Sequence, residues 1–133
     1  MYTSMLQQAT HMATRIGHVF VATAGAENTP HMAVARRMTL KDPETLHVQQ
    51  WFCPGTIENL RSNSHVSLVV WDRNTDRGYQ IIGETERLCD TGVTDCYFPR
   101  GEGRSLPQND NQLVIKVTKV VGFTRSAHTD SGV

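Results

Sequence analysis

The chain has 133 residues, and its 13 Lys and Arg residues balance its 13 Asp and Glu residues, so the formal net charge is zero. This length is typical of one domain, and we expect residues 1–133 to fold as a single unit. A neutral chain lacks the electrostatic attraction that draws proteins to nucleic acids or anionic membranes, so we expect neither as a partner. Small molecules and other proteins remain as candidate binding partners.

Cysteine and histidine spacing indicates neither a disulfide framework nor a metal site. The three cysteines, Cys53, Cys89 and Cys96, include no CxxC pair, and the six histidines show no HxH or HxxxH spacing. The first residues lack a basic segment followed by an apolar core, and no apolar run approaches the roughly 20 residues of a membrane-spanning helix. The sequence therefore predicts a cytoplasmic protein without a bound metal.

An N-terminal helix is predicted over residues 1–17. Ser4 and Gln7 fit the capping-box pattern at its start, and Gly17 is a typical residue at a helix end. Apolar residues recur at helical spacing between these points and form the expected buried face: Met5, Ala9, Met12 and Ile16.

Two strands follow, at 18–23 and 30–40, joined by a small and polar loop that is typical of a hairpin. One parity of the second strand is apolar and is expected to face the core: Met32, Val34, Met38 and Leu40. The other parity is small or polar and leaves room for a flat molecule: Ala33, Ala35, Arg37 and Thr39. Arg36 breaks the apolar parity, so either the strand bulges there or the side chain buries its stem and reaches solvent with its head.

The rest of the chain alternates strands with turns and short helices. Strands are predicted at 46–52, 66–71, 79–88 and 113–123, with a short helix after residue 54, a weak helix over 90–105 and a frayed tail over 124–133. About six strands without regular βαβ alternation favour a mostly antiparallel β-barrel with short helices.

The segment after the third strand has the features of an anion site. Pro54 and Gly55 punctuate the chain, and Thr56 is predicted to cap a short helix whose first-turn amides then point toward an anion. From the residues alone, Thr56 is more often only a cap than a phosphate ligand. Cys53 lies directly before this turn and is either a reactive thiol or, more commonly, a small buried side chain.

Four segments, in this order, resemble the FMN-binding split β-barrel family, the superfamily of pyridoxamine 5′-phosphate oxidase and its small flavin-binding relatives. They are Val21-Ala22-Thr23 with Pro30-His31, Arg37-Met38-Thr39-Leu40-Lys41, the pattern from Thr56 through Asn59 to Leu68, and Gly78-Tyr79 through Gly83 to Leu88. The resemblance covers roughly residues 14–123. It implies a mostly β fold with short helices, a six-stranded antiparallel split β-barrel of the FMN-binding type.

The resemblance further implies a homodimer with FMN between the subunits. The strand from Arg37 to Lys41 would run beside the flavin ring and turn Arg37 toward the phosphate, while Gly55 and Thr56 meet that phosphate at the helix start. Gly78 and Tyr79 would approach from the neighbouring strand or subunit. The cofactor-binding residues that it implies are Arg36, Arg37, Met38, Thr39, Gln49, Gln50, Trp51, Gly55, Thr56, Asn59, Gly78 and Tyr79.

Two departures limit the resemblance. The oxidases carry two basic residues at the places of Gly55 and Thr56, so phosphate binding here would depend on Arg37, with Arg36 as the other candidate, and on helix amides. Small FMN-binding relatives do carry Thr and Asn at the places of Thr56 and Asn59. The arginine-rich segment that the oxidases use for substrate has no counterpart after Phe123, so we do not expect pyridoxamine phosphate oxidase activity.

The leading hypothesis is an FMN-dependent oxidoreductase that takes electrons from NAD(P)H or a small reductant. The alternatives are a flavin-binding electron carrier or sensor without turnover, or the same fold binding F420 or haem. Simpler explanations also remain for single residues. Gln49 and Gln50 fit a half-exposed strand, and Trp51 and Tyr79 are more often core or interface anchors than flavin stackers.

Overall fold

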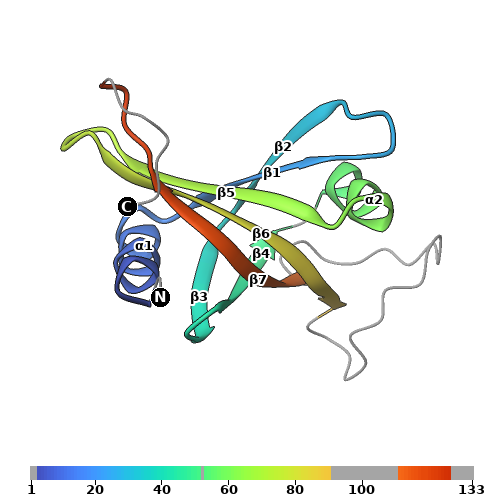
Figure 1. The fold of residues 1–133 in the computed structure, drawn as a ribbon, viewed down its shortest axis with the longest axis horizontal. Helices are drawn as coiled ribbons and strands as arrows, with labels where there is room; N and C mark the ends of the chain where they lie inside the picture. The colour runs from blue at the N-terminus through green and yellow to red at the C-terminus, as the bar shows by residue number, and fades with distance from the viewer. Residues whose placement is uncertain (1–2, 52, 91–110, 127–133) are drawn as a thin grey trace.

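The computed structural model describes residues 3–51, 53–90 and 111–126 (Figure 1). Within those residues it forms α1 (Thr3–Ile16), β1 (Val19–Ala24), β2 (Pro30–Ala35), β3 (Arg37–Asp42), β4 (Thr45–Trp51), α2 (Pro54–Ser62), β5 (His65–Asp72), β6 (Arg77–Asp90) and β7 (Asn111–Gly122). The weak helix predicted over 90–105 lies outside the described residues, apart from Asp90 at the end of β6.

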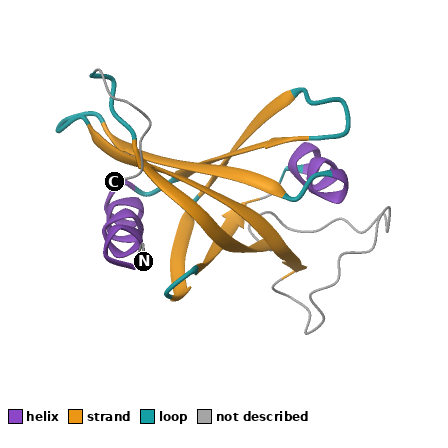
Figure 2. Ribbon diagram, viewed as in Figure 1, coloured by secondary structure: helices purple, strands orange, loops and turns teal. Residues whose placement is uncertain are grey.

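One antiparallel sheet holds all seven of these strands, in the order β2-β1-β5-β6-β7-β4-β3. The sheet curls so that α1 and α2 lie at opposite ends of it (Figures 1 and 2). Its two edge strands, β2 and β3, are consecutive in the chain and are joined through Arg36. The predicted fold class, mostly β and antiparallel with short helices, is confirmed. The described residues form seven strands, one more than predicted, because the segment predicted as one strand divides at Arg36.

The bend at Arg36 changes which side chains face the core. Ala35 and Met38 are each 1% exposed, and the two arginines between them are exposed. Two consecutive outward residues shift the alternation of the strand by one position. The structure shows neither alternative predicted for Arg36: β2 ends at Ala35, Arg36 is an exposed bend and β3 begins at Arg37, while Met38 lies in the core as predicted. The prediction that Met32 and Val34 face the core is wrong, since they are 60% and 54% exposed.

Helix α1 closes one end of the curled sheet by packing on β3 and β5. Its fully buried residues are Leu6, Ala9 and Ala13, while Met5, Met12 and Ile16 are only partly buried, so the buried face is rotated by about one residue from the prediction. Ser4 lies inside the helix rather than at its cap. Gly17 ends the helix as predicted, with a φ of 96° and its N–H donating to Ala13 O over 2.8 Å.

The hairpin between β5 and β6 holds the end of the described chain. Asp76 accepts hydrogen bonds from Trp71 Nε1 at 2.9 Å, Arg125 N at 2.8 Å and Ser126 Oγ at 2.7 Å. Donation from the Arg125 amide, then from Ser126 and Trp71, keeps the pKa of the Asp76 carboxyl far below its usual value. Fraying was predicted from residue 124 onward, but 124–126 are held here; 127–133 lie outside the described residues.

Within the described part of the chain, neither helix has the length and apolar character needed to cross a membrane.

Candidate functional site

Helix α2 begins earlier than predicted, and Thr56 is not its cap. The N-cap is Cys53, with extended backbone (φ −154°), and Pro54 opens the helix. Proline is favoured there because its fixed φ suits a helix and no amide is lost. The first bond from the helix back to its cap joins Ile57 N to Cys53 O at 3.2 Å. The amides of Gly55 and Thr56 precede that bond and are the ones that an anion could use.

His31 of β2 lies against the start of α2. Its Nε2 is 3.6 Å from Cys53 Sγ, and its Nδ1 is 3.5 Å from Thr56 Oγ1. Thr56 is fully buried, so its hydroxyl faces the imidazole rather than solvent. The Pro30-His31 pair belongs to the segments that carry the family resemblance, but no role was predicted for His31. Only the pairing of β1 with β2, which brings residue 31 beside α2, reveals the contact.

Asn59 fixes the position of α2 on the β1–β2 hairpin. Its Nδ2 donates to Thr23 Oγ1 over 3.0 Å, and Thr23 is only 5% exposed. A Cβ at Gly25 would lie 2.5 Å from Asn59 Oδ1, so a larger residue there would displace the Asn59 amide from this position. Asn59 was predicted as a cofactor ligand, and in the structure its amide nitrogen is engaged within the chain.

The outer face of β3, β4 and β7 is polar where Arg37 lies. Arg37 is paired with Gln49, which is paired with Gln112, and Gln49 Nε2 donates to Gln112 Oε1 over 2.7 Å. Paired residues of neighbouring strands share a face. Thr39 and His47 form the next pair on that face. Arg37 is exposed, and β3 is an edge strand, so alternate backbone groups of β3 point away from β4.

Three further predicted site residues belong to the same two strands. Met38 points into the core, so only its backbone can contact a ligand. Gln50 and Trp51 are the last two residues of β4, the strand that precedes α2 in the chain. The structure describes their backbone but not their side chains. Arg37, Thr39 and Gln49 are thus brought together on one face, close in the chain to the start of α2.

The structure does not bring Gly78 and Tyr79 to this face within one chain. Both lie at the start of β6, near the opposite helix, where the Tyr79 hydroxyl donates to Gln8 Oε1 of α1. Gly78 is packed between β5 and β7: a Cβ there would lie 2.4 Å from Val70 O. Its carbonyl also accepts the Phe123 N–H at 3.0 Å. Within the chain, Gly78 therefore serves strand packing.

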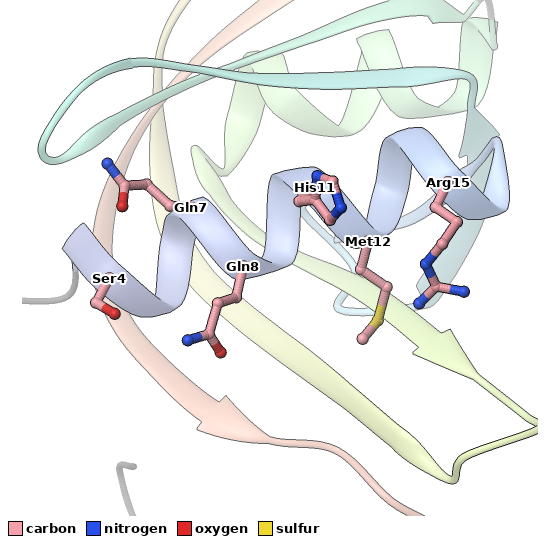
Figure 3. Close-up of a pocket in the computed structure, with 6 residues that line it drawn as sticks. All are labelled: Ser4, Gln7, Gln8, His11, Met12 and Arg15. Carbon is pink, nitrogen blue, oxygen red and sulfur yellow. The ribbon is translucent and has the colours of Figure 1, made fainter.

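On the part of the surface that the structure describes, two of the open hollows lie away from this face. One, of about 320 Å³, is lined by Ser4, Gln7, Gln8, His11, Met12 and Arg15 of α1. Figure 3 shows Gln8, Met12 and Arg15 extending from one side of that helix. The other, of about 270 Å³, lies on the outer face of β1, β5 and β6 and includes Ala22, Ser67 and Ile82. Neither hollow is lined by the start of α2.

Metal-binding side chains do not gather in the described part of the structure: no three of its His, Cys, Asp and Glu residues lie close enough together to hold an ion. The chemistry that this face offers is therefore that of a guanidinium, side-chain amides and backbone groups. Such groups bind and orient a ligand and do not themselves carry electrons, so a redox step on this face would need a bound cofactor.

Comparison with known proteins identifies the family. The sequence profile described as pyridoxamine 5′-phosphate oxidase matches residues 6–120. The chain belongs to the pyridoxamine 5′-phosphate oxidase family. The matched span includes β3, β4 and α2, and so the whole of the candidate face. The resemblance drawn from four sequence segments is thereby confirmed. No curated protein matches the chain.

Solved structures with the same fold are distant in sequence. HupZ of Group A Streptococcus is 21% identical, with a TM-score of 0.67 over 92% of this chain and 97% of that chain. An FMN-binding protein from Syntrophomonas wolfei subsp. wolfei is 14% identical, with a TM-score of 0.67 over 96% and 90%. An F420 reductase is 18% identical, with a TM-score of 0.59 over 83% and 93%. At these identities the likeness shows the fold alone.

Proposed function

We propose that this member of the pyridoxamine 5′-phosphate oxidase family is an FMN-dependent oxidoreductase, with the cofactor on the face formed by β3, β4 and the start of α2. One observation carries the proposal. Arg37 is paired with Gln49 near the end of β4, and α2 begins shortly after that strand, so we infer that one ligand can reach both the guanidinium and the amides of Gly55 and Thr56. A phosphate needs donors of both kinds.

The residues on this face match the parts of a flavin. The phosphate would take charge-assisted hydrogen bonds from Arg37 and hydrogen bonds from the helix amides. The polar edge of the ring would meet outward backbone groups of β3, while the small side chain of Thr39 leaves room beside it. Gln49, held by its bond to Gln112, offers a fixed side-chain amide. The flavin would supply the redox chemistry, and the chain would bind and orient it.

A second subunit is part of the proposal, and the outer face of β1 and β2 supports it. Phe20 and Val34 are paired side by side and are 36% and 54% exposed, and Met32 beside them is 60% exposed. The hollow that includes Ala22 and Ser67 adjoins this apolar patch, because Ala22 is paired with both Met32 and Ser67. A protrusion next to a hollow on one face can fit a second copy of itself about a two-fold axis.

The same dimer would account for Gly78 and Tyr79. They lie at the start of β6, where Tyr79 contacts Gln8 of α1, so they would approach the flavin only from the partner subunit. The change Val34→Lys should convert a dimer into a monomer by placing a charge in the apolar patch, and size-exclusion chromatography with light scattering measures this. Thr29→Lys, in the exposed loop before β2, is the matched control and should leave the dimer intact. A dimer that survives Val34→Lys would exclude this interface.

FMN binding is tested by fluorescence titration of wild type and Arg37→Gln. A hydrogen bond to a charged group contributes about 1.5–3 kcal/mol, so Kd should rise about 10- to 100-fold. Arg73→Gln removes the same charge from the exposed β5–β6 loop and is the control. Arg36→Gln shows which of the two neighbouring arginines acts on the phosphate. Equal Kd values for Arg37→Gln and Arg73→Gln would refute the proposed phosphate site.

Turnover separates an enzyme from a carrier. Protein loaded with FMN should consume NADPH or NADH continuously in the presence of a small acceptor, which absorbance at 340 nm follows. A single stoichiometric reduction without further consumption would favour the electron-carrier alternative.

F420 is the second candidate cofactor, because an F420 reductase shares this fold. Competitive titration of the protein with FMN and F420 distinguishes the two. Tighter binding of F420 than of FMN would replace the leading proposal with this one.

A further inference from the structure

Three polar side chains from separate parts of the chain meet where β2 reaches α2. His31 Nε2 lies 3.6 Å from Cys53 Sγ, and His31 Nδ1 lies 3.5 Å from Thr56 Oγ1. The imidazole therefore bridges a thiol and a hydroxyl. A nucleophile beside a base, with the base oriented by a third group, is the arrangement found in enzymes that use an activated thiol or hydroxyl.

The hydrogen-bond roles follow from the chemistry of imidazole. We assign the ring proton to Nδ1, which then donates to Thr56 Oγ1 and leaves Nε2 as the acceptor for the Cys53 thiol. Thr56 is fully buried within α2, so its oxygen is a fixed point for the ring. Cys53 is a free cysteine and is only half-buried.

The sequence makes room for this imidazole at Gly55. A Cβ on Gly55 would lie 2.8 Å from His31 Nε2 and 3.3 Å from both Cδ2 and Cε1. Real side chains do not approach that closely, so any residue larger than glycine would displace the ring from the sulfur. This observation is independent of the two hydrogen bonds, and it shows that the position of the ring depends on the absence of a side chain at residue 55.

The start of α2 adds electrostatic support. Cys53 is the N-cap residue of α2, so it lies at the positive end of the helix dipole. Two features therefore meet at this residue: a positioned imidazole that can accept the thiol proton, and a helix terminus.

We propose that Cys53 is a nucleophilic thiol that reduces hydroperoxides, with His31 as its base. His31 Nε2 takes the thiol proton, and the sulfur attacks one peroxide oxygen. The S–O bond forms as the O–O bond breaks, so sulfur is oxidised by two electrons to a sulfenic acid. The leaving hydroxide or alkoxide takes the proton from the imidazolium and departs as water or an alcohol. Thr56 is a positioning residue, since it acts through the ring.

A hydroperoxide is the electrophile that fits this setting. Cys53 is half-buried, and the imidazole fills the space over Gly55, which favours a small, uncharged reactant over a bulky one. A thiol reductant in solution returns the sulfenic acid to the thiol. The reaction needs no flavin, so this inference goes beyond the proposed oxidoreductase activity and does not depend on it.

The test uses flavin-free, full-length protein, hydrogen peroxide and a dimedone-type probe that traps sulfenic acid. Trypsin cleaves after Lys41 and Arg61, so Cys53 lies in a different peptide from Cys89 and Cys96. Mass spectrometry then measures labelling of Cys53 against the other two cysteines in the same sample. Cys53 should be labelled fastest.

Variants separate chemistry from folding. His31→Gln should slow labelling of Cys53 by at least about ten-fold, because positioned bases contribute 10²–10⁴-fold to proton transfer. His18→Gln changes another half-exposed histidine, one that packs edge-on against Phe20, and is the control. Thr56→Val should also slow labelling, and Thr56→Ser, which keeps the hydroxyl, should restore it.

Circular dichroism and FMN titration of the same variants report on the fold and on the flavin site separately. Two results would overturn the inference. One is a wild-type Cys53 that is labelled no faster than a cysteine in an unfolded peptide. The other is a folded His31→Gln variant with an unchanged labelling rate. Either result could occur with FMN binding intact, so failure here is distinct from failure of the proposed function.

Discussion

Asn59 is either a structural anchor between α2 and β1 or a cofactor ligand, and one substitution distinguishes the two roles. The change Asn59→Ala removes the donor that Thr23 Oγ1 accepts at 3.0 Å, and Thr23 is 5% exposed, so its hydroxyl would be left without that partner. An unsatisfied buried hydroxyl costs about 1–3 kcal/mol. Alanine is the better helix former by about 0.5 kcal/mol, which offsets part of this loss. We expect the free energy of unfolding to fall by about 1–2 kcal/mol.

A double-mutant cycle isolates the contact. Thr23→Val removes the acceptor and leaves the half-exposed Asn59 amide open to water, so its cost should be smaller, about 0.5–1 kcal/mol. The double variant should lose less than the sum of the single losses, with a coupling of about 1 kcal/mol. Urea denaturation of the four proteins gives these values. Unchanged stability in Asn59→Ala, together with lost FMN binding, would refute the anchor and make Asn59 a ligand.

Three further predictions concern the core, the chain end and the helix start. Met38→Ala should lower the free energy of unfolding by about 2–5 kcal/mol in chemical denaturation, because Met38 is 1% exposed; a loss below about 1 kcal/mol would place it outside the core. Because the pKa of Asp76 is lowered by folding, its contribution to stability is present above its ordinary pKa of 3.8 and is lost as pH falls below that value. The protection of the Ser126 amide, taken as its exchange rate in an unfolded peptide divided by its measured rate at the same pH, should therefore fall below that pH in wild type and lose this pH dependence in Asp76→Asn; equal profiles would exclude the carboxylate as the cause. Gly55→Ala should keep the fold but slow sulfenic-acid labelling of Cys53, since its Cβ would stand 2.8 Å from His31 Nε2, and an unchanged rate would show that the ring has another position beside the sulfur.

Order and type of the elements could be predicted because each has a local signal. The helical spacing before Gly17 and the β-branched run after Ser64 predict a helix and a strand that the structure contains. The alternation of apolar residues along the segment 30–40 did not reveal that two of them, in β2, face outward. Met32 and Val34 share a parity with Met38, and only the bend at Arg36 separates the two halves of that pattern.

The start of α2 was predicted within a few residues, but the side-chain contacts made there were not. Pro54 and Gly55 indicated a helix start, whereas the cap proved to be Cys53 without any side-chain bond. The contact between His31 and Cys53 joins residues 22 positions apart through strand pairing and helix packing. No spacing rule indicates such a tertiary contact, and the histidine was visible only as part of a family segment.

Size-exclusion chromatography with in-line light scattering and flavin absorbance, after incubation with FMN, shows whether the chain forms a dimer that binds flavin. We expect flavin to elute with protein at twice the mass of the chain, with one flavin per chain. Protein that elutes at the mass of a single chain and free of flavin would contradict this expectation.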